Sequence, residues 1–176
     1  MSEIFLYDNT KEHSAKINVL MAFPGIYSFG MSALGFLNVF KMIDTIDGVY
    51  AERYFTDSKT TVVHSSDIDV IGVSMSFEMD FLSVFKILEK FNVPFKAADR
   101  DENCPLIYGG GPVLSSNPEP FAEFFDFISL GDGCGAVRSI FEFIRDNKDL
   151  SRKEILQGLN DKFDFVYVPS LKTKAR

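Results

Sequence analysis

The feature that most constrains this chain is residues 67–77, with the sequence DIDVIGVSMSF. Two carboxylates lead into Val70, Ile71 and Val73, which are β-branched and do not alternate with polar residues. A strand that is buried on both faces has this pattern, because helices cover both sides of a parallel sheet. The stretch therefore predicts a central parallel strand over residues 68–74 and an α/β fold.

Strands and helices alternate along the rest of the chain. Further strands are predicted at residues 16–23, 49–55, 105–108 and 126–130, with a last extended piece at 163–168. Helices are predicted at residues 31–46, 78–91, 118–125, 136–146 and 151–159. This alternation predicts a doubly wound parallel sheet of five strands. The strand at 49–55 is less apolar than the others, so we expect it at an edge of the sheet.

The helix predicted at residues 31–46 contains a glycine, Gly35. A glycine inside a helix costs about 1 kcal/mol relative to alanine. Two explanations are open, namely close packing of the helix on the sheet or a ligand that approaches the backbone. Ser28 or Ser32 is the expected cap. The expected buried face consists of Leu34, Leu37, Phe40 and Ile43.

Charge and composition narrow the functional classes. The net charge of -7 argues against binding to nucleic acid or to an anionic membrane. The chain has no apolar stretch near the roughly 20 residues that span a bilayer, and it does not begin like a signal peptide. Its two cysteines, Cys104 and Cys134, are interpreted as free thiols. We therefore expect one cytoplasmic domain.

No catalytic or metal-binding constellation is evident in the sequence. His13 and His64 both lie among polar neighbours, without a partner at metal-ligand spacing. Neither cysteine is flanked by a histidine, so no nucleophile–base pair is formed locally. We predict no catalytic residue and no metal ligand in this segment.

A ligand site is predicted instead where the strands end. The carboxyl ends of parallel strands line the ligand crevice of an open α/β sheet. Glycine- or serine-rich runs stand at four such ends, and glycines let a ligand meet the backbone. The alternative for each run is an ordinary turn, and each serine is equally well explained as a helix cap. The candidate residues are Ser28, Gly30, Ser74, Ser76, Gly109, Gly110, Gly111, Gly131 and Gly133.

Residues 131–136 (GDGCGA) match the relaxed form of the dinucleotide-binding fingerprint. The match follows the fifth predicted strand and not the first, and no acidic residue ends a following strand. The chain also lacks the Gly-Lys-Ser/Thr of a P-loop. Dinucleotide and ATP binding are therefore disfavoured, while phosphate contact at this turn stays open.

Residues 23–35 (FPGIYSFGMSALG) are similar to the opening of a cobalamin-binding-like domain that precedes the catalytic barrel in a group of radical S-adenosylmethionine (radical SAM) proteins. Residues 67–74, 109–112, 117–120 and 131–133 resemble its later motifs, in the same order. The resemblance implies a flavodoxin-like sheet of order 2-1-3-4-5. It divides the chain into an N-terminal arm (1–15), a cobalamin-binding-like α/β domain (16–168) and a linker toward a C-terminal catalytic domain (169–176).

The same resemblance implies a cofactor. The glycines after the fourth strand would take the nucleotide tail of a corrinoid, and Ser74 would meet its lower base. The chain lacks the Asp-x-His-x-x-G motif whose histidine ligates cobalt, and residues 24–30 occupy its place. Ser76 stands where the related pattern has leucine, and Cys134 where it usually has glutamate. Cobalamin bound here would therefore have no histidine ligand from the protein.

The resemblance also implies a partner. The Cys-x-x-x-Cys-x-x-Cys site, whose thiolates hold an iron–sulfur cluster, is absent from residues 1–176. We expect the 4Fe-4S cluster and S-adenosylmethionine in a downstream radical SAM domain of the same protein, and no turnover by this segment alone. The expected function is an accessory domain that holds a corrinoid. The alternative is a ligand-free docking or lid domain that packs on the radical SAM barrel.

Overall fold

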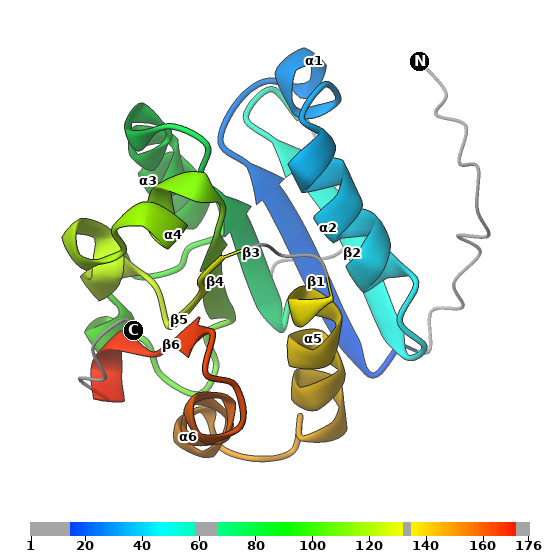
Figure 1. Ribbon diagram of the computed structural model, residues 1–176, viewed down its shortest axis with the longest axis vertical. Coiled ribbons are helices and arrows are strands. Elements are labelled where there is room, and N and C mark those ends of the chain that lie inside the picture. The colour runs from blue at the N-terminus through cyan, green and yellow to red at the C-terminus, as the bar shows by residue number, and fades with distance from the viewer. Residues whose placement is uncertain (1–14, 59–66, 132–134, 172–176) are drawn as a thin grey trace.

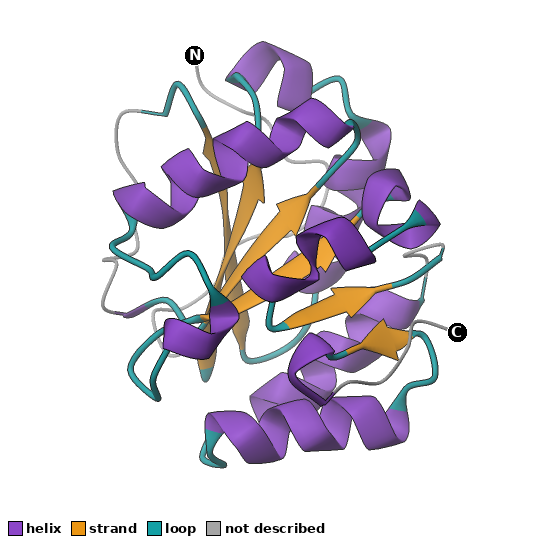
Figure 2. Cartoon of the chain, turned by 90° about the vertical axis from the view of Figure 1, so that its left-hand side faces the viewer, coloured by secondary structure: helices purple, strands orange, loops and turns teal. Residues whose placement is uncertain are grey.

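The computed structural model describes residues 15–58, 67–131 and 135–171. These residues form an α/β fold in which one sheet carries helices on both sides (Figures 1 and 2). The order of the strands is β2-β1-β3-β4-β5-β6, and the first five run parallel to one another. The strands are β1 (Ile17–Phe23), β2 (Val49–Phe55), β3 (Val70–Ser74), β4 (Leu106–Gly110), β5 (Phe127–Ser129) and β6 (Val166–Tyr167).

The predicted order 2-1-3-4-5 is confirmed, and so is the edge position of β2, but the predicted number of five strands is wrong. The extended piece at residues 163–168 contains a sixth strand, β6, which runs antiparallel to β5 and pairs Tyr167 with Ile128. Both residues of β6 are buried. The short strand therefore covers the edge of β5 that would otherwise present unpaired backbone groups.

Two layers of helices bury the two faces of the sheet. Buried side chains of α2, α5 and α6 form one core cluster with the sheet, and those of α3 and α4 form the other. No helix among the described residues is long and apolar enough to cross a membrane. The helices are α1 (Tyr27–Gly30), α2 (Leu34–Asp44), α3 (Phe81–Lys90), α4 (Pro112–Ser116), α5 (Ala136–Asp146) and α6 (Arg152–Lys162). Short 3₁₀ turns occupy Glu78–Asp80, Ala97–Asp99, Glu119–Phe124 and Pro169–Leu171.

The helix predicted at residues 31–46 is divided into α1 and α2. The expected serine cap is wrong, because Ala33 precedes α2 and makes no side-chain cap, while the Ser32 hydroxyl donates to the Phe29 carbonyl at 2.8 Å. The expected apolar face is also wrong at Leu34, which is 75% exposed. The buried face follows the spacing of Phe36, Phe40 and Ile43, and Leu34 lies off this stripe.

A buried ion pair ties the segment before β4 to the sheet. The side chains of Arg100 and Asp126 are 0% and 2% exposed, and Nη1 of the arginine lies 2.9 Å from Oδ2 of the aspartate. The same oxygen accepts from the backbone N–H of Ile107 at 2.7 Å and lies 2.6 Å from Nη2 of Arg152. One carboxylate therefore joins β4, β5 and α6.

Candidate functional site

A cavity of about 740 Å³ opens at the carboxyl ends of the central strands. One wall is α2 and another is the start of α4, which lie on either side of the ends of β3 and β4 (Figure 1). The lining residues are Met21, Ala33, Gly35, Phe36, Asn38, Val39, Met42, Val73, Ser74, Ser76, Tyr108, Gly110, Gly111, Pro112, Ser115, Ser116, Ser129 and Gly131. The cavity thus occupies the crevice that the parallel topology predicts.

The ends of three strands meet around this cavity. Ser74 at the end of β3 is paired in register with Gly110 at the end of β4. Gly131, which follows β5, donates its backbone N–H to the Ser115 hydroxyl of α4 at 3.0 Å. The expectation that the polar strand ends share one edge of the sheet is confirmed by these contacts.

The cavity brings together part of the predicted set of ligand-binding residues. Ser74, Ser76, Gly110, Gly111 and Gly131 line it. Three others do not, and Gly133 lies outside the described residues. Whether the five lining residues bind a cofactor stays a prediction.

The three predicted residues outside the cavity have other environments. Ser28 is exposed in α1, and a Cβ on Gly30 would meet the rings of Phe55 and Phe23. A Cβ on Gly109 would point into the opposite core, 2.7 Å from Leu114 and 2.9 Å from Phe125. Gly109 and Gly110 differ because successive residues of a strand face opposite sides of the sheet.

The absence of side chains at three glycines shapes the cavity. A Cβ on Gly110 would lie 2.9 Å from the Tyr108 hydroxyl and 3.4 Å from Oγ of Ser129, so a side chain there would press against these two groups. Gly111 has φ +105°, and a Cβ there would collide with the carbonyl oxygen of Met75. A Cβ on Gly35 would meet nothing within 4 Å, which excludes close helix–sheet packing as the reason for this glycine.

Tyr108 and Ser129 are lining residues that the sequence reasoning missed. The Tyr108 hydroxyl and Ser129 Oγ are 2.7 Å apart, and both side chains are buried. Burial raises the pKa of Tyr108 to about 12, although its hydrogen bond to Ser129 acts in the other direction. The phenol is therefore protonated at neutral pH. Each residue stands two positions before a cavity glycine, Gly110 or Gly131. Residues two apart in a strand lie on the same face, so this spacing could have predicted both as lining residues.

The cavity lining is polar but uncharged. None of the described residues that line it is acidic or basic. Within the described ranges, the hydroxyls of Ser74 and Ser76 have no hydrogen-bond partner. Met21, Val39 and Met42 add apolar surface. The arrangement suits a flat group with a hydrogen-bonding edge, which would stack on the apolar side chains and meet the hydroxyls.

Comparison with known proteins adds two findings. A family described as radical SAM proteins, N-terminal, matches residues 35–169. The "Uncharacterized protein MJ0966" of Methanocaldococcus jannaschii is 24% identical over 117 residues, which cover 65% of this chain and 24% of that protein. The chain thus spans about a quarter of the length of this curated relative.

Proposed function

This chain belongs to the family of radical SAM N-terminal domains, and from that premise we propose that its cavity holds the nucleotide tail of a corrinoid. The domain is an accessory domain of a radical SAM protein. The observation that carries the finer proposal is the uncharged cavity of about 740 Å³, bordered by Gly110 and Gly111 at the end of β4. A cavity of this size is in the range of small-molecule and cofactor sites.

The residues of the cavity fit the parts of such a tail. The lower base is a flat heteroaromatic ring, and Met21, Val39 and Met42 offer apolar surface to its faces. Ser74 and Ser76 offer hydroxyls to its polar edge. Gly110 and Gly111 allow the tail to approach the backbone of β4 without meeting a side chain.

A bound corrinoid supplies cobalt-centred radical chemistry, and the chain's own residues bind and orient its tail. The loop after β1, residues 24–30, carries no histidine that could ligate the cobalt. The protein would then hold the cofactor through the tail, and this loop would offer it no imidazole. An absorbance spectrum of the bound form distinguishes this arrangement from histidine ligation.

A titration of hydroxocobalamin against the protein, followed by absorbance, tests the proposal. The wild type is expected to bind, and Ser74→Ala is expected to weaken binding about fivefold, because one hydrogen bond contributes roughly 1 kcal/mol. Ser170→Ala is the matched control, since Ser170 is exposed and does not line the cavity. No binding by the wild type would contradict the proposal, and equal binding by Ser74→Ala and wild type would remove Ser74 from the site.

The lack of a histidine after β1 favours a second candidate function. In this alternative the domain binds no cofactor and acts as a docking or lid domain on the radical SAM barrel. It predicts that hydroxocobalamin leaves the stability of the protein unchanged, whereas a ligand that binds only the folded state raises it. A thermal melt with and without hydroxocobalamin separates the two functions.

A further inference from the structure

Six large apolar side chains are exposed beside the cavity, and we call them the apolar rim. They come from two segments, and their exposed fractions lie between 42% and 75%. The members are Ile26, Phe29, Leu34, Phe77, Met79 and Leu82. Exposed apolar residues are ordinary when they are scattered, but a group of them beside a cavity marks an interaction site.

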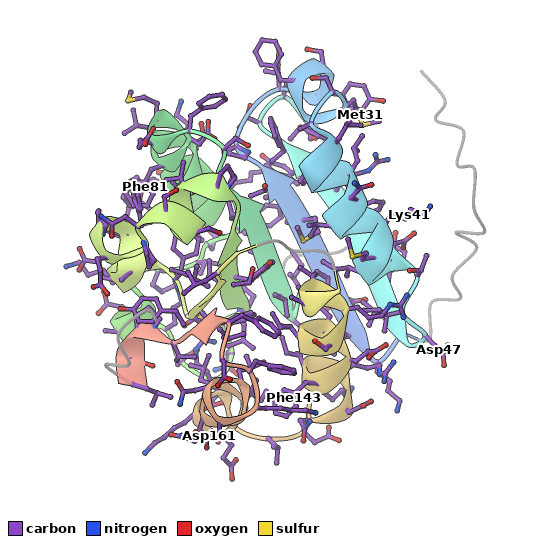
Figure 3. All side chains as sticks on the ribbon, in the orientation of Figure 1. Met31, Lys41, Asp47, Phe81, Phe143 and Asp161 are labelled. Atoms are coloured by element: carbon purple, nitrogen blue, oxygen red, sulfur yellow. The ribbon has the colours of Figure 1, made fainter. Side chains whose placement is uncertain are left out.

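The two segments of the apolar rim lie at the same edge of the sheet. The first connects β1 to α2 and the second connects β3 to α3, and β1 and β3 are parallel neighbours. The first segment contributes Gly35 to the cavity lining and the second contributes Ser76. Figure 1 shows α1 and α3 at this end of the molecule, and Figure 3 shows Met31 and Phe81 there, away from Asp47 and Asp161.

Two carboxylates hold the backbone of the rim segments. Asp57 Oδ1 accepts from the backbone N–H of Tyr27 at 2.8 Å. Asp80 Oδ2 accepts from the backbone N–H groups of Ser76 and Phe77 at 2.9 and 2.8 Å. The exposed side chains therefore stand on turns that are already ordered, which lowers the entropic cost of binding a partner.

The opposite edge of the sheet has a different character. A cavity there is lined by Asp67, Glu102, Lys148 and Arg152, which are charged. The first rim segment, by contrast, has no charged residue from 24 to 35. The only charged residues of the second segment, from 76 to 82, are the carboxylates Glu78 and Asp80. The rim segments therefore lack the cationic groups that bind nucleic acid or an anionic membrane surface. A folded protein surface is the partner that fits this edge.

We propose that the radical SAM domain of the same protein packs on the apolar rim and covers the mouth of the cavity. The chain belongs to a family of domains that stand N-terminal in radical SAM proteins. Its match covers only 24% of the length of its curated relative, so most of that protein lies outside the matched region. The proposal rests on the accessory-domain function and not on the bound corrinoid.

The test uses the full-length protein with a protease site placed between residue 171 and the radical SAM domain. After cleavage, the wild-type halves are expected to stay together in size-exclusion chromatography. The double variant Leu34→Asp/Phe77→Asp should weaken their association about a hundredfold, because large side chains at an interface often contribute about tenfold each. Leu150→Asp is the matched control, since Leu150 is 44% exposed and lies beside the charged cavity of the opposite edge.

Three outcomes contradict the proposal. The first is that the wild-type halves separate on cleavage. The second is that the halves of the double variant stay associated as tightly as those of Leu150→Asp. The third is that the double variant only breaks a dimer of the uncleaved protein. The double variant is also titrated with hydroxocobalamin. If the double variant still binds hydroxocobalamin and its halves stay associated, the docking surface alone is refuted. If the halves of the double variant separate and the wild type binds no hydroxocobalamin, the corrinoid proposal alone is refuted.

Discussion

Asp126→Asn is expected to lower the free energy of unfolding by about 3–5 kcal/mol, because it leaves buried positive charge without its counterion. Arg100 has no exposed side-chain surface, and burial lowers its pKa against the favourable effect of Asp126. Its remaining partners are the backbone carbonyls of Pro94, Phe95 and Phe124. Carbonyl dipoles solvate a guanidinium group but do not neutralise it.

Urea denaturation of the variant measures this loss. Glu123→Gln is the matched control, because it removes an ion pair of similar length, Lys96–Glu123 at 3.0 Å, whose side chains are both 56% exposed. The control should change the stability by less than about 1 kcal/mol. If Asp126→Asn lowers the free energy of unfolding as little as the control does, the buried pair contributes little to the stability of the fold.

Gly35→Leu is expected to abolish detectable binding of hydroxocobalamin while the domain stays folded. Gly35 lines the cavity from α2, and a Cβ there meets nothing within 4 Å, so a leucine side chain extends into open space. Replacing a glycine in a helix also favours the folded state, by up to about 1 kcal/mol. If this variant loses binding, the cause is therefore that leucine fills the space of the ligand, and not that the domain unfolds.

Gly35→Ala is the matched control, because it makes the same backbone change and fills little of the cavity. It should bind hydroxocobalamin much as the wild type does. Gly110→Val is less informative, since a Cβ at this position lies 2.9 Å from the Tyr108 hydroxyl and would disturb the fold as well as the ligand. If Gly35→Leu binds as tightly as Gly35→Ala in the same absorbance titration, the tail does not lie in this cavity.

Part of the candidate site was predictable because it follows from topology. The apolar run at Val70, Ile71 and Val73 identifies a buried parallel strand, and parallel strands end at a common edge. Ser74 and the glycines at the end of β4 are therefore brought to the same edge by any parallel sheet in which β3 and β4 are neighbours. The choice between Gly109 and Gly110 was not predictable from composition, because it depends on which face of β4 is turned to α2.

The sequence by itself determined the parallel α/β class and the edge of the sheet at which the cavity lies, because both follow from local patterns and general rules of chain connection. The order of the first five strands was implied by the family resemblance. Only the tertiary structure decided the antiparallel pairing of β6, the burial of Arg100 against Asp126, and the open space beside Gly35. Each of these depends on the distance between segments far apart in the chain. A local pattern of apolar and polar residues carries no information about such distances.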